Sequence, residues 1–322
     1  MVRLPGLLAA LAASLAAVSA ASQADWPTKP VRIVVALAPG GANDLLARLL
    51  AAQLAKAFGQ AFIVENRPGA GGNIGAAEVA RSAPDGYTLL MGGPGTQAIN
   101  QFLYPTMPYN TERDFAPVSL VARVPKVLVV HPALGVRSLE ALVDRAKAKP
   151  GSIYYGSAGI GTSTHLSTEL FKTMAKIDLV HVPYRGSGPM LQDLVAGEVQ
   201  MAIDNVPSAM PYIRSGKLLA LGVASSQPIA ELPNVPTIAS VIPGYEVEAW
   251  FALMAPAATP APTVARLAAE VDQILHRPET IARFRQLGAE PGGGTPAELA
   301  TFIAHETDMW REVVKASGAK AD

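Results

Sequence analysis

Two segments of the chain place a glycine-rich turn between a predicted strand and a predicted helix. The first turn is Pro39-Gly40-Gly41-Ala42-Asn43-Asp44, and the second, from Ser157 to His165, includes Gly159, Gly161, Thr162 and Ser163. Glycine lets the backbone approach a ligand closely, and the N–H groups of a first helical turn have no acceptor within the helix. Those donors and the positive end of the helix dipole suit an anion. Either turn alone is typical of an ordinary helix start, but the pair predicts one shared anion site.

Neither turn contains Lys or Arg. A bound carboxylate would therefore depend on neutral donors, namely backbone N–H groups, the hydroxyls of Thr162 and Ser163, and His165. We expect His165 to face the ligand because it lies in the first turn of its helix. Asp44 carries a negative charge of its own, so we expect it to cap its helix or orient water and backbone without touching the anion.

The other residues with catalytic or metal-binding chemistry form no recognisable constellation. The chain has no Cys, and its five histidines show neither H-x-H nor H-E-x-x-H spacing, which argues against a zinc site. Ser157 lacks the glycine two positions before it that a nucleophile elbow requires. The residues from Gly69 to Gly75 read G-x-G-x-x-x-G, but Asn66-Arg67-Pro68 precedes them, which favours a structural turn over a dinucleotide site. We predict no catalytic residue, metal or cofactor.

Short β-rich runs alternate with helical patterns around these turns, which is typical of mainly parallel sheets covered by helices. The predicted strands are Val31–Leu37, Phe62–Glu65, Tyr87–Gly92, Val127–Val130, Ile153–Tyr155, Val199–Ile203 and Leu218–Val223. Three helical patterns end the chain, at Thr263–His276, Glu279–Leu287 and Pro296–Ala316. The apolar runs Val118–Val130 and Glu248–Ala255 are candidates for segments that cross between two lobes. We expect residues 25–124 and 247–322 to form one lobe and residues 125–246 the other.

Residues 1–24 have the pattern of a secretory signal peptide. Arg3 precedes an apolar run from Leu7 to Val18, which is too short to span a bilayer, and small residues follow up to Ala24. The 322-residue chain balances 26 Lys and Arg against 26 Asp and Glu, so it has no basic field that would attract nucleic acid. We predict an exported, periplasmic protein without a nucleic-acid partner.

With these patterns in hand, residues 26–315 resemble the Bug family, the receptors of tripartite tricarboxylate transporters. The resemblance depends on several blocks taken together. In the first half they are Trp26-Pro27-x-Lys29-Pro30-Val31-Arg32-Ile33-Val34-Val35, Pro39-Gly40-Gly41-x-x-Asp44-x-x-Ala47-Arg48, Glu65-Asn66-Arg67-Pro68-Gly69-Ala70-Gly71-Gly72-Asn73-Ile74-Gly75 and Pro84-Asp85-Gly86-Tyr87-Thr88-Leu89-Leu90. In the second half they are His165-Leu166, His181-Val182-Pro183-Tyr184-Arg185-Gly186 and Leu232-Pro233-x-Val235-Pro236-Thr237.

The resemblance implies an α/β, two-lobed periplasmic-binding-protein fold of type II, with the ligand in the cleft between the lobes. Carried over position by position, it assigns ligand contacts to the two turns described above. Thr96 and Gln97, after one strand, and Asp204 and Asn205, after another, would line the rest of the cleft. Leu37 stands where the family often has an aromatic residue, and Gln97 where it often has His. Both flank the pocket, so contacts to the distal end of the ligand do not carry over.

These features favour a receptor that captures a small organic carboxylate for the large and small membrane subunits of a tripartite tricarboxylate transporter, without enzymatic activity. Two alternatives stay open at this point. One is a periplasmic sensor that signals to a membrane histidine kinase, and the other, with weaker support, is an exported enzyme. The sequence does not separate transport from sensing, because both need the same closing lobes. The effector domain of a cytoplasmic transcription factor can share this fold, but the predicted signal peptide argues against it.

Overall fold

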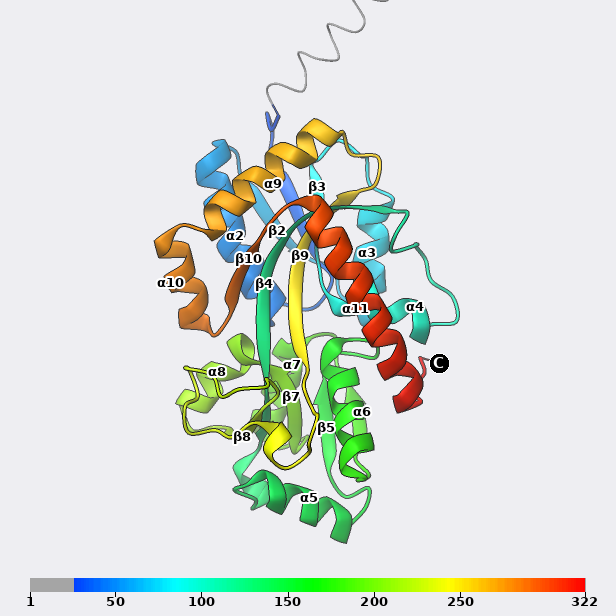
Figure 1. Cartoon of the computed structure of the whole chain (residues 1–322), viewed down its shortest axis with the longest axis vertical. Coiled ribbons are helices and arrows are strands. Elements are labelled where there is room, and N and C mark those ends of the chain that lie inside the picture. The colour runs from blue at the N-terminus through cyan, green and yellow to red at the C-terminus, as the bar shows by residue number, and fades with distance from the viewer. Residues whose placement is uncertain (1–25, 322) are drawn as a thin grey trace, which may run out of the picture.

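The structure, a computed structural model, describes residues 26–321. The predicted signal peptide, residues 1–24, lies outside the described residues. The chain forms two α/β lobes stacked along the long axis of the molecule, and the long strands β4 (Phe115–Val130) and β9 (Glu248–Pro256) run from one lobe into the other (Figure 1). In the described part of the chain, no helix combines the length and the apolarity that a membrane span requires.

The first lobe is built on β1 (Val31–Val35), which pairs in parallel with β2 (Phe62–Asn66) and β3 (Thr88–Gly92). On the other side of β3, the strand β9 (Glu248–Pro256) pairs antiparallel. The side chains of Ile33, Val34 and Val35 are all fully buried. Burial on both faces explains why β1 is apolar at every position except Arg32, as expected for a parallel strand covered by helices on each side.

The second lobe has a smaller sheet with mixed pairing. The strand β5 (Tyr154–Ser157) lies between β6 (Val180–Pro183) and β7 (Met201–Asn205) and is parallel to both. The end of β4, from Lys126 to Val130, pairs antiparallel with β7 and with β8 (Leu219–Val223).

The two lobes share β4 (Phe115–Val130), a strand of 16 residues. From Phe115 to Pro125 it pairs with β9, and from Lys126 to Val130 it pairs with β7. One continuous path of strands therefore runs through both lobes in the order β2-β1-β3-β9-β4-β7-β5-β6. The two apolar runs predicted to cross between lobes are these two strands.

Helices cover both faces of the first-lobe sheet. On one face, α2 (Ala42–Phe58), α9 (Ala261–Leu275) and α10 (Pro278–Leu287) share a core with Ile33 and Val35. On the other face, α3 (Asn73–Ala80) and α11 (Pro296–Ser317) share a core with Val34. The second lobe carries α5 (Leu139–Ala148), α6 (Ser163–Ala175), α7 (Ser187–Ala196) and α8 (Val206–Arg214), and the short α4 spans Asn100–Leu103.

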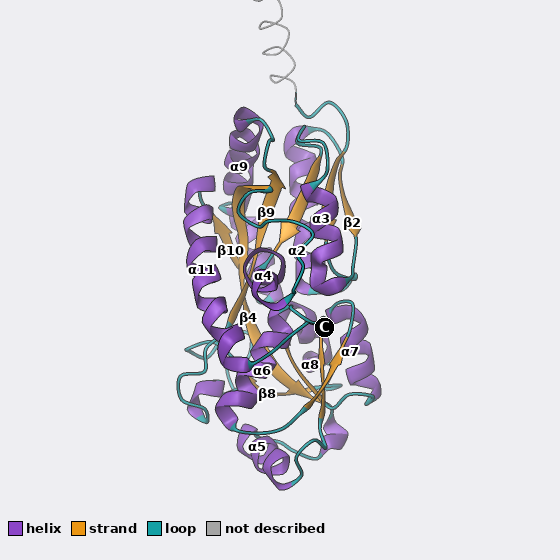
Figure 2. Ribbon diagram, turned by 90° about the vertical axis from the view of Figure 1, so that its right-hand side faces the viewer, coloured by secondary structure: helices purple, strands orange, loops and turns teal. Residues whose placement is uncertain are grey.

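The three helices predicted at the end of the chain are present, and the last one reaches the second lobe. Helix α11 begins with a capping box in which Thr295 and Glu298 satisfy each other's backbone N–H groups, as the Thr-x-x-Glu pattern favours. It packs on β4 and also on α6 of the second lobe. Figure 1 and Figure 2 both show it descending from the first lobe to the level of α6.

Two strands were predicted neither as strands nor as crossing segments. The strand β10 has the sequence Glu290-Pro291-Gly292-Gly293 and pairs antiparallel with β4 at the sheet edge. Proline and glycine read as a turn, but an edge strand tolerates proline because one of its sides needs no ladder hydrogen bond. The strand β6 is only four residues long and is the last strand in the sheet order, where its side chains are half-buried or exposed. Its weak apolar pattern gave no strand signal.

Candidate functional site

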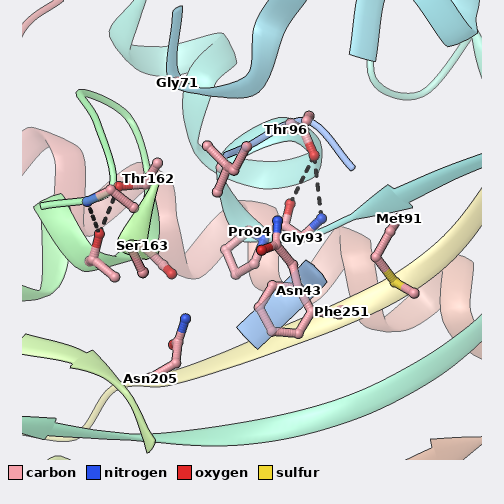
Figure 3. Close-up of a pocket in the computed structure, with 16 residues that line it drawn as sticks. Asn43, Gly71, Met91, Gly93, Pro94, Thr96, Thr162, Ser163, Asn205 and Phe251 are labelled. Carbon is pink, nitrogen blue, oxygen red and sulfur yellow. Dashed lines mark hydrogen bonds between the residues drawn. The ribbon is translucent and has the colours of Figure 1, made fainter. Parts of the chain in front are cut away.

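A cavity of about 50 Å³ lies between the lobes, where β1, β3, β5 and β7 end. Polar side chains line it from both sides, as Figure 3 shows: Asn43 and Thr96 from the first lobe, and Ser163 and Asn205 from the second. Its other walls come from Ala36, Leu37, Gly71, Met91, Gly93, Pro94, Gly95, Ala158, Thr162, Thr164, Ser187 and Phe251. Ligands of open α/β sheets typically bind beyond the carboxyl ends of the strands, and this cavity has that position.

Some of the residues predicted for the site line this cavity and others lie around it. The lining includes Leu37, Asn43, Thr96, Thr162, Ser163 and Asn205. The remaining predicted residues are in the same loops or strand ends but do not line it: Pro39, Gly40, Gly41, Ala42, Asp44, Gln97, Ser157, Gly159, Gly161, His165 and Asp204.

In the first loop, Asp44 holds the backbone in place. Its carboxylate accepts hydrogen bonds from the Gly40 N–H at 3.1 Å, from Arg48 at 2.9 Å and from Asn66 at 3.0 Å. The buried carboxylate is thus satisfied within the loop and its neighbours. The adjacent Asn43 accepts a hydrogen bond from the Asp44 N–H through its Oδ1 at 3.0 Å. The N–H groups of the Asn43 amide therefore stay available to a ligand in the cavity.

In the second loop, a chain of hydroxyl hydrogen bonds fixes the start of α6. The Ala158 N–H donates to Thr164 Oγ1 at 2.9 Å, Thr164 Oγ1 lies 2.9 Å from Thr162 Oγ1, and Thr162 donates to the Gly159 carbonyl at 2.7 Å. The Thr162 oxygen also caps α6 by accepting the His165 N–H. The Thr162 proton is therefore used within the loop, although we expected it to be available to an anion.

His165 lies beside the second loop but faces away from the cavity. Its ring stacks on that of His181, with centroids 4.2 Å apart, and His181 stacks in turn on Tyr155 at 4.7 Å. Burial lowers the pKa of His165 to about 4, although Glu169 opposes the shift. Burial, reinforced by His165 and Lys172, lowers the pKa of His181 to about 3. Both rings are neutral near pH 7 and form part of the wall that supports the loop.

The structure also shows a serine–histidine contact that the sequence spacing did not reveal. Ser157 Oγ lies 2.7 Å from His181 Nε2 and accepts the Gly159 N–H at 3.1 Å. Ser157 is fully buried and does not line the cavity. A histidine whose pKa is about 3 is a poor general base at neutral pH. The pair therefore supports the loop and lacks the features of a nucleophile and its base.

Because the stacked rings of His165 and His181 are buried and neutral, we expect the protein to lose stability in mild acid. Both histidines have pKa values below the 6.5 of an unperturbed group, so the unfolded chain binds more protons once the pH falls through 6.5. Their contribution is complete above that pH and is lost as the pH falls toward 4, by up to about 1.4 kcal/mol per pH unit for each ring. Thermal unfolding between pH 7.5 and 5 should show a falling midpoint.

Two variants test the assignment of this pH effect. His181→Asn should flatten the profile, whereas His305→Asn, at an exposed position of α11, should keep the slope of the wild type. A midpoint that does not change from pH 7.5 to 5 would contradict the neutral, buried stack.

Sequence reasoning missed a buried lysine next to the cavity. Lys126, on β4, is fully buried, and its Nζ donates to Ser163 Oγ at 3.1 Å and to Asn205 Oδ1 at 3.2 Å. Burial lowers the pKa of Lys126 to about 8, and the negative charge of Asp204 partly opposes that shift. The lysine therefore stays mainly protonated at pH 7. The sequence does contain a signal for this residue: Lys126 is a charged residue directly before the apolar run Val127–Val130, whose side chains are all fully buried.

Asp204 lies behind the cavity wall as well. Its carboxylate is fully buried and accepts hydrogen bonds from Ser187 at 2.7 Å and from Ser208 at 2.8 Å. Burial raises the pKa of Asp204, and these hydroxyls and Lys126 oppose the rise. Asp204 thus touches the cavity only through Ser187, which lines it.

Gln97 faces a different space from the one expected. It lines a second cavity of about 230 Å³ beneath α11, together with Thr111, Phe115 and Ile303. Both polar atoms of its amide are buried without a hydrogen-bond partner among the described residues. Gln97 belongs to a π-helical turn, Gly95–Ile99, in which successive side chains point in different directions. Thr96 consequently reaches the cavity between the lobes and Gln97 does not.

The lobes touch each other beside the cavity. The Ala38 N–H of the first lobe donates to the Arg185 carbonyl of the second at 2.8 Å, and the Tyr104 hydroxyl donates to the Ile160 carbonyl at 3.0 Å. Gly188, in the first turn of α7, packs so closely that a Cβ there would lie 2.1 Å from the Pro39 carbonyl oxygen. These contacts describe a closed arrangement of the two lobes.

Comparison with known proteins identifies the family to which the chain belongs. Residues 46–319 match the tripartite tricarboxylate transporter family receptor, TctC. BugT of Bordetella pertussis is 38% identical over 322 residues, which cover 99% of each chain. A solved R. palustris protein with adipate is 42% identical, with a TM-score of 0.90 over 92% of this chain and 100% of its own. MatC from Rhodopseudomonas palustris, with bound malate, is 36% identical, with a TM-score of 0.86 over 90% and 100%.

These comparisons confirm the predicted fold, a two-lobed α/β periplasmic-binding-protein architecture. They also decide against the enzyme alternative, because the matching proteins form a family of binding proteins. The chain belongs to the Bug, or TctC, family of tripartite tricarboxylate transporter receptors and is a solute-binding receptor.

Proposed function

We propose that the cavity between the lobes binds a small organic carboxylate, with contacts from both lobes at once. The observation that carries the proposal is the meeting of Asn43 from the first lobe with Ser163 and Asn205 from the second around one small cavity. The Asn43 amide keeps free N–H donors there, and donors of this kind suit a carboxylate. Relatives solved with adipate and with malate support the same ligand class.

The ligand enters, in this proposal, when the lobes move apart. A space of about 50 Å³ holds a few water molecules and is narrow for a dicarboxylate. The lobes are taken as residues 25–124 with 247–322, and residues 125–246. Support comes from β4, whose pairing partner changes from β9 to β7 between Pro125 and Lys126. A ligand that makes more contacts in the closed form shifts the population toward it.

Delivery of the ligand to membrane subunits completes the proposed role. Residues 1–24 would direct export to the periplasm and then be removed, and the closed lobes would dock on the large and small membrane subunits of a tripartite tricarboxylate transporter. The support is the family to which the chain belongs, whose members are receptors of such transporters, together with the signal-peptide pattern of the N-terminus.

A thermal-shift and calorimetry panel of adipate, malate and succinate tests the proposed function. A micromolar ligand binds with about −8 kcal/mol, and a ligand at about 100 times its Kd stabilises the folded protein by about 2.7 kcal/mol. We expect at least one carboxylate to raise the unfolding midpoint by several degrees. Adipamide, which keeps the carbon chain of adipate but carries no charge, is the matched control. Two results would contradict carboxylate recognition. In one, adipamide stabilises the protein as much as adipate does; in the other, no carboxylate of the panel stabilises it.

A further inference from the structure

Two groups on the second-lobe wall of the cavity, the Ser163 hydroxyl and the Asn205 amide, are both held from behind by Lys126. The lysine does not itself line the cavity. Its Nζ lies 3.1 Å from Ser163 Oγ and 3.2 Å from Asn205 Oδ1. An ammonium group has three N–H donors and no acceptor, so both of these contacts are hydrogen bonds that the lysine donates.

The direction of those two hydrogen bonds decides what the wall presents to a ligand. Asn205 accepts the hydrogen bond from Lys126 through Oδ1, so its Nδ2 and both N–H groups point away from the lysine. Figure 3 shows this nitrogen directed toward Ser163, into the space between the two side chains. Within residues 26–321, Asn205 Nδ2 donates to no protein acceptor, and the Ser163 hydroxyl makes only the bond that it accepts from Lys126. The serine proton is therefore also available to a ligand.

The charge of the lysine strengthens both donors. A hydroxyl that accepts a hydrogen bond from a cation becomes a better donor, because hydrogen bonds in a chain polarise one another in a low-dielectric interior. Lys126 is fully buried, so its field at the cavity is weakly screened by solvent. The charged side chain that affects Lys126 is Asp204, which raises the pKa of the lysine. The Asp204 carboxylate itself accepts hydrogen bonds from Ser187 and Ser208.

We propose that Lys126 is a positioning residue of the ligand site, which turns the Ser163 hydroxyl and the Asn205 amide into donors that face a ligand carboxylate and places a positive charge behind them. The inference rests on the proposed function, because it assumes that a carboxylate occupies this cavity. It explains how a wall of neutral side chains attracts an anion without a direct ion pair. It also predicts that anionic ligands depend on Lys126 more than uncharged ones do.

Calorimetry with adipate, malate and succinate tests the proposal on Lys126→Met, which keeps a straight side chain and removes the charge. At pH 7 we expect affinity for the carboxylates to fall about 10- to 100-fold, the scale of one charge acting through protein. Because Lys126→Met leaves the buried Asp204 without its counter-charge, the variant can fail to fold. The double variant Lys126→Met/Asp204→Asn carries no buried charge here and should fold while showing the same loss of affinity. Asp204→Asn alone should lower the pH above which carboxylate affinity falls, because the charge of Asp204 raises the pKa of Lys126.

A pH profile of the wild type separates this role from a purely structural one. Burial lowers the pKa of Lys126 to about 8, and a bound carboxylate favours the protonated lysine. Affinity should therefore be complete below pH 8 and fall above it, by up to about tenfold per pH unit, whereas the double variant should show a flat profile. A flat wild-type profile from pH 7 to 9.5, or a folded double variant that binds as the wild type does, would overturn the proposal. If the wild type binds none of the three carboxylates, the proposed function fails and this inference falls with it.

Discussion

Replacing Gly188 with alanine should leave the protein folded but weaken ligand binding by about 1–3 kcal/mol, the usual cost of overpacking a tight contact. The new Cβ would lie 2.1 Å from the Pro39 carbonyl oxygen and 3.6 Å from Gly40 Cα. These are backbone atoms of the opposite lobe, so they cannot rotate away as a side chain would. When the lobes are apart the contact does not exist, and alanine is then better than glycine in a helix by up to about 1 kcal/mol.

The variant should therefore combine an unchanged or higher unfolding midpoint without ligand with a lower affinity in calorimetry. Small-angle scattering should show that a saturating carboxylate reduces the radius of gyration of the wild type more than that of Gly188→Ala. Gln192→Ala, at an exposed position of the same helix, is the matched control and should bind as the wild type does. Unchanged affinity in Gly188→Ala would mean that the liganded lobes do not approach as closely as they do in this structure.

Thr162→Val should reduce both the stability of the second lobe and the affinity for the ligand, each by about 1–2 kcal/mol. Valine has nearly the shape of threonine but cannot cap α6, and it breaks the chain of hydrogen bonds to Thr164 and the Gly159 carbonyl. The loop that carries Ser163 would then lose its fixed geometry. The loss of affinity would follow from a displaced loop, because the Thr162 proton is already used by Gly159.

Thr162→Ser keeps the hydroxyl and is the control for this change. Calorimetry should give it nearly the affinity of the wild type, and thermal unfolding should give it nearly the same midpoint. A Thr162→Val protein with wild-type affinity would show that the loop from Ser157 to His165 does not shape the ligand site.

The crossing strands and the two turns were predictable because their signals are local. The run Val118–Val130, in which only Ser119, Arg123 and Lys126 are polar, is long for a single strand, and it forms most of β4. Similarly, Gly40-Gly41 and Gly159-x-Gly161 precede helices: α2 begins directly after Gly41, and α6 begins after Gly161 and its capping residue Thr162. Glycine and helix-capping residues act on their own segment, so sequence alone indicates where such turns occur.

The directions of individual side chains were not predictable, because they depend on segments far apart in the chain. His165 was expected to face the ligand, but it stacks on His181, which β6 brings beside it. Gln97 was placed in the ligand cleft, but the π-helical turn directs it beneath α11. Lys126 acquires its importance only when β4 and β7 pair and bring Asn205 next to it.

A crystal structure of the protein with the tightest-binding carboxylate of the panel tests the central claim most directly. We expect one carboxylate group within about 2.7–3.2 Å of Ser163 Oγ and Asn205 Nδ2, while the same ligand contacts Asn43 or Thr96 of the first lobe. A ligand that touches one lobe alone would contradict the claim. So would a ligand bound outside the cavity, for example beside Arg185 in the neighbouring pocket lined by Ile74 and Tyr184.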